Sequence, residues 1–396
     1  MTSVTVRRVE TQHDYRTLLH FPWKHYQDNP YWVPPLLSMH RHRLDREHNA
    51  TWQHMEGDYF IAWQDGEPVG TIAALINHRH NEFWDERIGF FGLFESIDDP
   101  AVAHALLETA SAWVAGKGYE RIRGPVTFSV NDECGLLIEG FDDPPVVLYP
   151  YNPPYYPALI ESAPGFHKVM DTYAYYITMQ GALESPKVQR LQRLVHINSQ
   201  RRGVVVRSPN LKNLKADLTL LRELYNAAWE KNWGFVPFSD AELDELIKDM
   251  GQYLNPHLTL FAEVHGEPAG FLLALPDLNQ ALKRAYPRPG KPEIITLLQV
   301  LWHWKIRSKI TRLRVPLMGV KKQFRGVGVE AAMFIELLER GKQFAPKKGW
   351  DYADGGWVLE TNRPMQSLVE QLNGYVYKRF RFYERELNPS AGEKAD

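Results

Sequence analysis

The sequence predicts an α/β protein of two tandem domains, each a mixed, largely antiparallel sheet flanked by helices. The chain has 396 residues, 44% of them hydrophobic, and a single core usually stops growing at about 250–300 residues. Two hairpin-like segments carry Gly-Glu-Pro turns, which begin 200 positions apart at Gly66 and Gly266. Hairpins alternate with strand–helix–strand units, a pattern typical of a mixed sheet covered by helices.

The same order of elements is predicted in both halves. In the first half we expect a hairpin at 58–76, a strand at 88–95, a helix at 101–117, a strand at 119–124 and a short helix after Pro154. In the second half we expect a hairpin at 259–275, a strand at 313–319, a helix at 328–344, a strand at 354–360 and a helix from Pro364. Each hairpin has β-branched and aromatic runs on both sides of a polar turn.

A second repeat favours duplication of one domain. The order Asn, Pro, Leu, Glu and Gly-aromatic occurs from Asn152 and again from Asn362. Short Gly-Glu-Pro turns also recur by chance, but two matches at nearly the same offset favour a repeated unit. We therefore predict an N-terminal domain at 1–182, an exposed basic linker helix at 183–208 and a C-terminal domain at 209–390.

Composition and charge argue against several classes of protein. The chain has 46 basic and 48 acidic residues and a formal net charge of -2, so no overall field draws it to nucleic acid. Cys134 is the single cysteine, which rules out an internal disulfide and cysteine-based zinc sites. The histidine clusters that begin at His40 and His78 lack metal-site spacing, so we predict solvated basic surface there and no metal. Without a run of about 18 apolar residues, the chain is predicted to be cytoplasmic, or peripheral at the inner membrane face.

The stretch GVKKQFRGVGVEAAM, from Gly319 to Met333, joins a predicted strand to a predicted helix. The first amides of a helix lack internal partners and the helix dipole is positive there, so an anion is favoured. Gly326 and Gly328 would let that anion approach the backbone closely. The loop matches neither a Walker motif nor a dinucleotide fingerprint. A phosphate-binding loop of another type is therefore predicted.

Gln323-Phe324-Arg325-Gly326-Val327-Gly328 resembles the Gln/Arg-x-x-Gly-x-Gly/Ala signature of the GCN5-related N-acetyltransferase (GNAT) superfamily, which holds the pyrophosphate of coenzyme A. The resemblance continues through a strand to Asn362 and then to Gly374-Tyr375. It implies two tandem GNAT-like domains, the second of which uses acetyl-CoA or a longer acyl-CoA as co-substrate. The coenzyme contacts that it implies are Met318, Val320, Gln323, Phe324, Arg325, Gly326, Val327, Gly328, Val329 and Asn362.

The first half lacks such a loop. Glu95-Ser-Ile-Asp98-Asp99-Pro100 stands in its place, and these carboxylates would repel a pyrophosphate. The first domain is therefore expected to be a platform for the acceptor, or a scaffold.

The whole chain also resembles a group of bacterial acyltransferase-like proteins, some of which are implicated as ceramide synthases. The blocks that carry this resemblance are Phe21-Pro-Trp, Asn29-Pro-Tyr-Trp-Val-Pro-Pro35, Gly89-Phe-Phe-Gly92, Asn131-Asp-Glu-Cys-Gly135, Tyr151-Asn-Pro-Pro-Tyr155 and Asn232-Trp-Gly-Phe235.

Attack of an amine on a thioester needs a base, an oxyanion donor and a route for the leaving thiolate. In the superfamily a backbone amide is the oxyanion donor, here between Met318 and Val320. The position of the usual acid tyrosine holds Val369. Tyr375, Tyr377 and Tyr383 are the alternatives, of which we select Tyr377.

Asp132 and Glu133 are the predicted bases, with Asn131 as a substrate contact, because polar loops after strands commonly carry sites. The alternative is an Asx-type turn with solvated acids. Cys134 is predicted to be buried packing rather than a nucleophile.

Two segments bear on the acceptor. Trp229, Asn232 and Trp233 are predicted to wall an acceptor pocket, although aromatic residues at this spacing also form cores. The segment 294–314 reads as amphipathic and basic, so it could contact a membrane and admit a lipid amine. Its alternative is packing against the core with basic ends in water.

The predicted function is acyl transfer from acyl-CoA to a small-molecule or lipid amine. Long-chain transfer to a lipid amine and a non-catalytic coenzyme A sensor, motivated by Val369, are the alternatives. No nucleic-acid partner is predicted.

Overall fold

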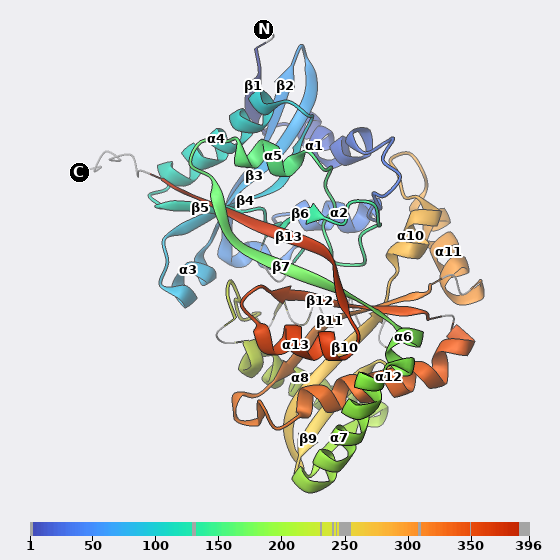
Figure 1. Cartoon of the computed structure of the whole chain (residues 1–396). Helices are drawn as coiled ribbons and strands as arrows, with labels where there is room; N and C mark the ends of the chain where they lie inside the picture. The colour runs from blue at the N-terminus through green and yellow to red at the C-terminus, as the bar shows by residue number, and fades with distance from the viewer. Residues whose placement is uncertain are drawn as a thin grey trace. The chain divides into compact units, whose positions relative to one another are not determined.

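The computed structural model describes residues 3–128, 132–229, 232–239, 241–242, 244, 255–307, 310–348 and 350–387. The chain forms two compact units (Figure 1). Unit 1 comprises Met1–Thr172, Ala285–Leu297 and Lys378–Asp396, and unit 2 comprises Tyr173–Arg284 and Leu298–Tyr377. Each unit has its own hydrophobic core.

Unit 1 is built on a mixed sheet with the strand order β1-β2-β3-β4-β5-β13, and β6 also pairs with β13. Strands β4 and β5 are parallel, and the other registered pairs of this unit are antiparallel. Helix α4 packs on the sheet with its apolar face in the core. The elements are β1 (Thr5–Arg8), α1 (Gln12–His25), α2 (Leu37–Leu44), β2 (Met55–Gln64), β3 (Glu67–Asn77), α3 (His78–Trp84), β4 (Ile88–Ser96), α4 (Pro100–Gly116), β5 (Arg121–Gly124), β6 (Leu136–Glu139), α5 (Tyr156–Glu161), β7 (His167–Thr178) and β13 (Tyr375–Glu386).

Unit 2 repeats this plan with the strand order β7-β12-β11-β10-β9-β8, in which β11 and β12 are parallel. Strands β7 and β13 contribute residues to both units. The elements after β7 are α6 (Met179–Glu184), α7 (Pro186–Arg202), β8 (Val204–Arg207), α8 (Leu214–Trp229), β9 (Thr259–Val264), β10 (Glu267–Pro276), α10 (Asn279–Ala285), α11 (Glu293–Leu301), a π-helical turn η3 (Trp302–Ile306), β11 (Arg312–Val320), η4 (Lys322–Phe324), α12 (Val329–Lys348), β12 (Tyr352–Leu359) and α13 (Arg363–Gln371).

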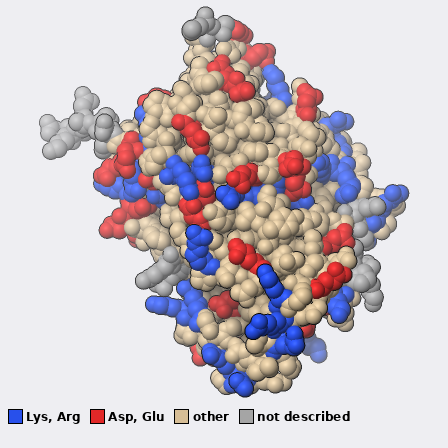
Figure 2. All heavy atoms as spheres, viewed as in Figure 1, with Lys and Arg blue, Asp and Glu red and all other residues tan. Residues whose placement is uncertain are grey.

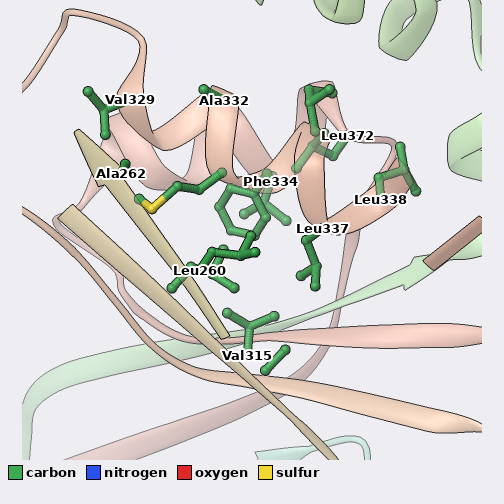
Figure 3. Close-up of a cluster of buried hydrophobic side chains, with 14 of the residues drawn as sticks. Leu260, Ala262, Val315, Val329, Ala332, Phe334, Leu337, Leu338 and Leu372 are labelled. Carbon is green, nitrogen blue, oxygen red and sulfur yellow. The ribbon is translucent and has the colours of Figure 1, made fainter. Parts of the chain in front are cut away.

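The core of unit 2 fixes where α12 begins. Phe334 and Leu337 of α12 point toward Leu260 of β9 and Val315 of β11 in one buried cluster, which also contains Leu338 (Figure 3). Burying one such side chain contributes about 1.5–3 kcal/mol. Alternate residues of β9 point to the other face of the sheet, where Phe261 packs with α8. With both faces covered, the loop before α12 is held at the end of β11.

The two predicted hairpins are confirmed and share one turn geometry. Asp65 and Gly66 have φ angles of 52° and 83°, and His265 and Gly266 have 52° and 82°. Two successive positive φ angles are the signature of a type I′ turn, which matches the twist of the flanking strands. The repeated turn sequence thus encodes a repeated backbone conformation.

Two expectations about surface residues are wrong. His40 and His80 were expected in solvent, but both are buried. His80 lies on α3, where its ring contacts Phe90 and its Nε2 is 3.0 Å from Glu86 Oε2. The predicted basic segment 294–314 is also not one amphipathic helix, because Arg312 and Arg314 lie in β11 and are buried there.

The structure also divides the chain at other places than the sequence predicted. The segment 183–208 was expected to be a linker, whereas α7 packs against α12 within unit 2. The residues from Lys378 onward belong to unit 1 because β13 pairs there with β5. Within the described residues, no helix combines the length and the apolar character needed to cross a bilayer.

Candidate functional site

Strands β11 and β12 diverge part way along their length. Their parallel pairing runs from Arg312–Tyr352 to Val315–Gly355, whereas β11 continues to Val320 and β12 to Leu359. The second half of β11 stays paired on its other side, with β10 from Leu273 to Gly270. Beyond Val315, some backbone groups of β11 point toward β12. Among the described residues, no strand pairs with these groups. Such groups are available to an extended ligand.

The loop after β11 presents free amides at the start of α12. Gly326 and Gly328 have φ angles of 76° and 95°, a conformation that glycine adopts without strain. None of the hydrogen bonds found between described residues is donated by the amides of Gly326, Gly328 or Val329. A Cβ atom at Gly326 would meet nothing within 4 Å. This loop is thus open, with unpaired donors beside a positive helix end.

Side chains hold the carbonyl groups of the loop and leave its amides unoccupied. Arg325 donates from Nε to the Val320 carbonyl at 3.2 Å and from Nη2 to the Ala228 carbonyl at 2.6 Å. Asn198 of α7 donates from Nδ2 to the Val327 carbonyl at 2.7 Å. The same Nδ2 would lie 2.5 Å from a Cβ atom at Gly328. Carbonyls fixed in this way, beside amides that donate to no described residue, make a preorganised anion site.

The other predicted coenzyme contacts are placed as follows. Met318 and Val320 lie in the half of β11 that pairs with β10 but not with β12, and Phe324 packs partly into the core. Gln323 donates to Glu267 Oε1 at 3.0 Å. The Asn362 side chain accepts from the Met365 amide at 3.3 Å and so caps α13.

Tyr377 lies close to the point where β11 and β12 separate. Its hydroxyl donates to Asp354 Oδ2 at 2.7 Å, and Asp354 pairs with Arg314 one position before the last β11–β12 pair. Asp354 is buried, and Tyr176 packs against the rings of both Tyr375 and Tyr377.

The other tyrosine candidates are placed differently. Tyr375 is exposed, whereas Tyr383 is buried in unit 1 and donates to Glu161. Val369, at the position of the superfamily tyrosine, is buried in the core of unit 2. Of the predicted acids, Tyr377 is therefore the one at the strand divergence.

The predicted bases form an ion-pair cluster in unit 1. Arg43 donates to Glu133 through two bonds, from Nη1 to Oε2 at 3.1 Å and from Nη2 to Oε1 at 3.0 Å. Burial opposes the charge of Arg43, but Glu133 and Asp132 together raise its pKa above the usual value. Cys134 is buried, as predicted.

The remaining predicted contacts are described only in part. Asn131 and the side chain of Trp229 lie outside the described part of the chain. Asn232 accepts the Phe235 amide through its carbonyl at 3.0 Å, and Trp233 is half-buried. Within the described ranges, no cluster of three His, Cys, Asp or Glu side chains could hold a metal ion.

The corresponding region of unit 1 is occupied by the chain itself. The β4–β5 pairing ends at Phe90–Arg123, and the Val126 amide then donates to the Phe91 carbonyl at 2.9 Å. The Asp99 side chain accepts from the Ala101 amide at 2.8 Å, so a carboxylate already caps α4. Neither feature could be deduced from the acidic composition of this loop alone.

Glu95 sits at the end of β4 in unit 1 as a half-buried carboxyl group. Its Oε2 accepts from the hydroxyls of Tyr26 and Tyr156, each at 2.6 Å. Burial raises the pKa of Glu95 from 4.5 to about 7, although the two hydrogen bonds act in the opposite direction. Sequence reasoning treated Glu95 only as a repulsive charge, because the tyrosines that hold it are distant in the chain.

Glu95→Gln should make unfolding less dependent on pH. Because the folded pKa lies above the ordinary value of 4.5, the wild-type free energy of unfolding should fall as pH rises from about 4.5 to about 7, by up to about 3 kcal/mol. The amide of glutamine carries no charge, so its advantage over glutamate should be larger at pH 8 than at pH 5. Urea unfolding at both pH values measures this, with the exposed Glu120→Gln as control. An equal difference at both pH values would contradict the shifted pKa.

Known proteins resemble this chain in sequence and in fold. No protein-family model matches it. It is 33% identical over 383 residues to Protein YghO of Escherichia coli (strain K12), covering 96% of this chain and 95% of YghO. It is 31% identical over 385 residues to the Bacterial ceramide synthase of Caulobacter vibrioides (strain NA1000 / CB15N), covering 97% and 98%.

Among solved structures, a tandem GNAT protein from the clavulanic acid biosynthesis pathway matches with a TM-score of 0.54 at 11% identity. The match covers 98% of this chain and 100% of that protein. At this identity the match establishes the fold, and it confirms the predicted tandem arrangement.

Proposed function

Because the chain belongs to the family of Escherichia coli YghO and the Caulobacter vibrioides Bacterial ceramide synthase, we propose that it is an acyl-CoA-dependent N-acyltransferase. The tandem GNAT fold supports an acyltransferase in general. The observation that carries the coenzyme assignment is the loop before α12. There the amides of Gly326, Gly328 and Val329 donate no hydrogen bond to any described residue, while the carbonyls of Val320 and Val327 accept from Arg325 and Asn198.

The residues of unit 2 fit an acyl-CoA. The diphosphate would take the amides at the start of α12, where the helix dipole adds about 0.3–1 kcal/mol of stabilisation. The unpaired edge of β11 offers backbone groups to the extended part of the coenzyme. An acyl-CoA supplies an acyl group already activated as a thioester. The β11 amides between Met318 and Val320 would then stabilise negative charge that develops on its carbonyl oxygen.

Tyr377 would supply a proton to the departing thiolate. In the free protein its hydroxyl donates to Asp354 Oδ2 at 2.7 Å, so the hydroxyl would turn from Asp354 to the sulfur and transfer its single proton there. Because the thiolate of a free thiol has a pKa near 8.5, it can also leave unprotonated, though less readily at low pH. Asp132 and Glu133 remain the proposed bases.

Transfer of a long acyl chain to a lipid amine is the more specific candidate. It is favoured by the relative named Bacterial ceramide synthase, which is 31% identical over nearly all of this chain. A small-molecule amine remains the alternative acceptor, and a coenzyme A sensor without catalysis is the alternative to an enzyme.

Thiol release measures the proposed activity directly. Acetyl-CoA and palmitoyl-CoA would be offered with a panel of small amines and sphingoid bases, and free coenzyme A followed with a thiol reagent. Release that requires both the thioester and an amine, with mass spectrometry of the amide, would support the transferase. Binding of coenzyme A by calorimetry without turnover would favour the sensor, and no binding would contradict both.

Tyr377→Phe should slow the proposed reaction by about 100-fold at pH 7 while leaving KM for the thioester nearly unchanged, since a general acid contributes about 10²–10⁴-fold. The loss should shrink above the thiol pKa of about 8.5, where the thiolate leaves without a proton. Tyr375→Phe is the matched control, because Tyr375 is two residues away on the same strand and exposed. If the rate of Tyr377→Phe were reduced by the same factor at every pH, Tyr377 would not be the general acid.

A further inference from the structure

Helix α11 and the turn η3 expose a ridge of large apolar side chains, which we call the apolar ridge. It consists of Ile294, Leu298, Leu301, Trp302 and Ile306, which are 63%, 62%, 52%, 46% and 65% exposed. The side chain of this helix that is buried is Thr296, at 1%. The helix therefore buries the polar Thr296 and exposes its large apolar side chains, the reverse of a helix that packs on a core. These side chains therefore do not pack against the core, which was the alternative expected for this segment.

We propose that the apolar ridge docks onto the surface of an anionic lipid bilayer. Contiguous exposed apolar surface of this kind marks an interaction site. With nine residues α11 is far too short to span a bilayer, which takes about 20. A short helix with one apolar face instead lies in the interface, with that face among the acyl chains.

The charges at the C-terminal end of the apolar ridge favour a negatively charged surface. Lys305 Nζ lies 3.6 Å from the centre of the Trp304 ring, and Arg307 Cζ lies 5.9 Å from that of Trp302. A cation beside an indole suits the boundary between headgroups and acyl chains, because the ring enters the apolar layer while the cation meets lipid phosphate. Figure 2 shows Lys and Arg side chains along the margin where Figure 1 places α11.

The beginning of α11 belongs to unit 1 and is fixed there by hydrogen bonds. Glu293 accepts from the Ser38 amide at 2.9 Å and from the Ser38 hydroxyl. Upstream, Trp23 Nε1 donates to the Pro287 carbonyl at 2.7 Å. These bonds use the polar end of the helix and leave the apolar ridge uncovered. A surface held in this way can bind a bilayer without first becoming ordered, which lowers the entropic cost of docking.

Vesicle flotation of the full-length chain tests the proposal without any acyl-CoA, so its result does not depend on the transferase activity. The chain should float with vesicles of phosphatidylcholine and phosphatidylglycerol, and much less with phosphatidylcholine alone. Leu298→Ser with Leu301→Ser should weaken this partitioning by roughly 100-fold, about tenfold for each leucine removed from the acyl layer. The matched control is Leu194→Ser with Ile197→Ser on α7, which has the same spacing and exposures of 55% and 48%.

A second pair of variants separates charge from apolar contact. Lys305→Glu with Arg307→Glu should remove most of the preference for phosphatidylglycerol, about fivefold or more for each charge, and high salt should do the same to the wild type. The proposal is overturned if the wild type does not float with anionic vesicles, or if the ridge and control variants bind equally. It is also overturned if the leucine variant only converts a dimer to a monomer in sedimentation and keeps its vesicle binding.

Discussion

Gly326→Glu is expected to abolish binding of coenzyme A while the fold is retained. The new carboxylate would stand where the diphosphate meets the amides before α12. Two like charges about 4 Å apart repel by roughly 4 kcal/mol at an effective dielectric constant of 20, which corresponds to about a thousandfold loss of affinity. A Cβ atom at this position would meet nothing within 4 Å, so the substitution creates no clash at the backbone. Calorimetric titration with coenzyme A measures the change.

Two controls isolate the charge from the backbone conformation. Gly66→Glu introduces the same side chain at a φ angle of 83°, close to the 76° of Gly326, again with nothing within 4 Å. It should cost the same backbone strain and leave the affinity unchanged. Gly326→Ala should cost about 1–2 kcal/mol of stability and keep most of the affinity. An unchanged dissociation constant for Gly326→Glu would show that this loop does not bind the diphosphate. The proposal that acyl-CoA is the donor substrate would then fail as well.

Local sequence patterns predicted the repeated hairpins and the strand–loop–helix at 312–348 well. Turn residues such as Asp65-Gly66 encode their own φ angles, and the apolar periodicity of α12 specifies which face meets the sheet. Such information lies within a few residues of the chain. The tandem fold and the position of the candidate loop could therefore be predicted without the structure.

Contacts between distant residues could not be predicted in this way. Asn198 donates to the Val327 carbonyl, which is 129 residues away in the sequence. Arg43 pairs with Glu133, which is 90 residues away. Nothing in the local sequence distinguishes these side chains from solvated ones. His80 was missed although its partners are near in the chain, because its contacts with Phe90 and Glu86 form only when α3 packs beside β4.

The apolar ridge shows a different limit of sequence reasoning. The segment 294–314 was predicted as one amphipathic stretch, but its basic residues divide between two environments. Lys305 and Arg307 are exposed beyond α11, whereas Arg312 lies in β11 and donates to the Tyr352 hydroxyl at 2.6 Å. Hydrophobic periodicity indicated an apolar face on this helix. Whether that face is buried or exposed depends on which side chain packs against the rest of the fold, and here that side chain is Thr296.

Gly92→Ala should destabilise unit 1 by at least about 3 kcal/mol, a large part of the 5–15 kcal/mol that holds a typical domain together. A Cβ atom at Gly92 would lie 1.7 Å from the carbonyl oxygen of Val126. That backbone cannot retreat freely, because the Val126 amide is bonded to Phe91 and Val126 also bridges Cys134. Urea unfolding should show the loss, with Gly116→Ala as control. Gly116 ends α4 with nothing within 4 Å, so its alanine should be neutral or slightly stabilising.

The same close contact supports the proposal that unit 2 alone binds the coenzyme. Ala73 of β3 pairs with Gly92, and the residue 200 positions after Ala73, Leu273 of β10, pairs with Leu317. Unit 2 thus tolerates a full side chain where unit 1 requires none, because in unit 1 the backbone at Val126 lies against β4. If Gly92→Ala left the unfolding curve unchanged, the chain would not fill that space, and unit 1 would become a candidate for a second coenzyme. If the loss is found, titration of the wild type should saturate at one coenzyme A per chain.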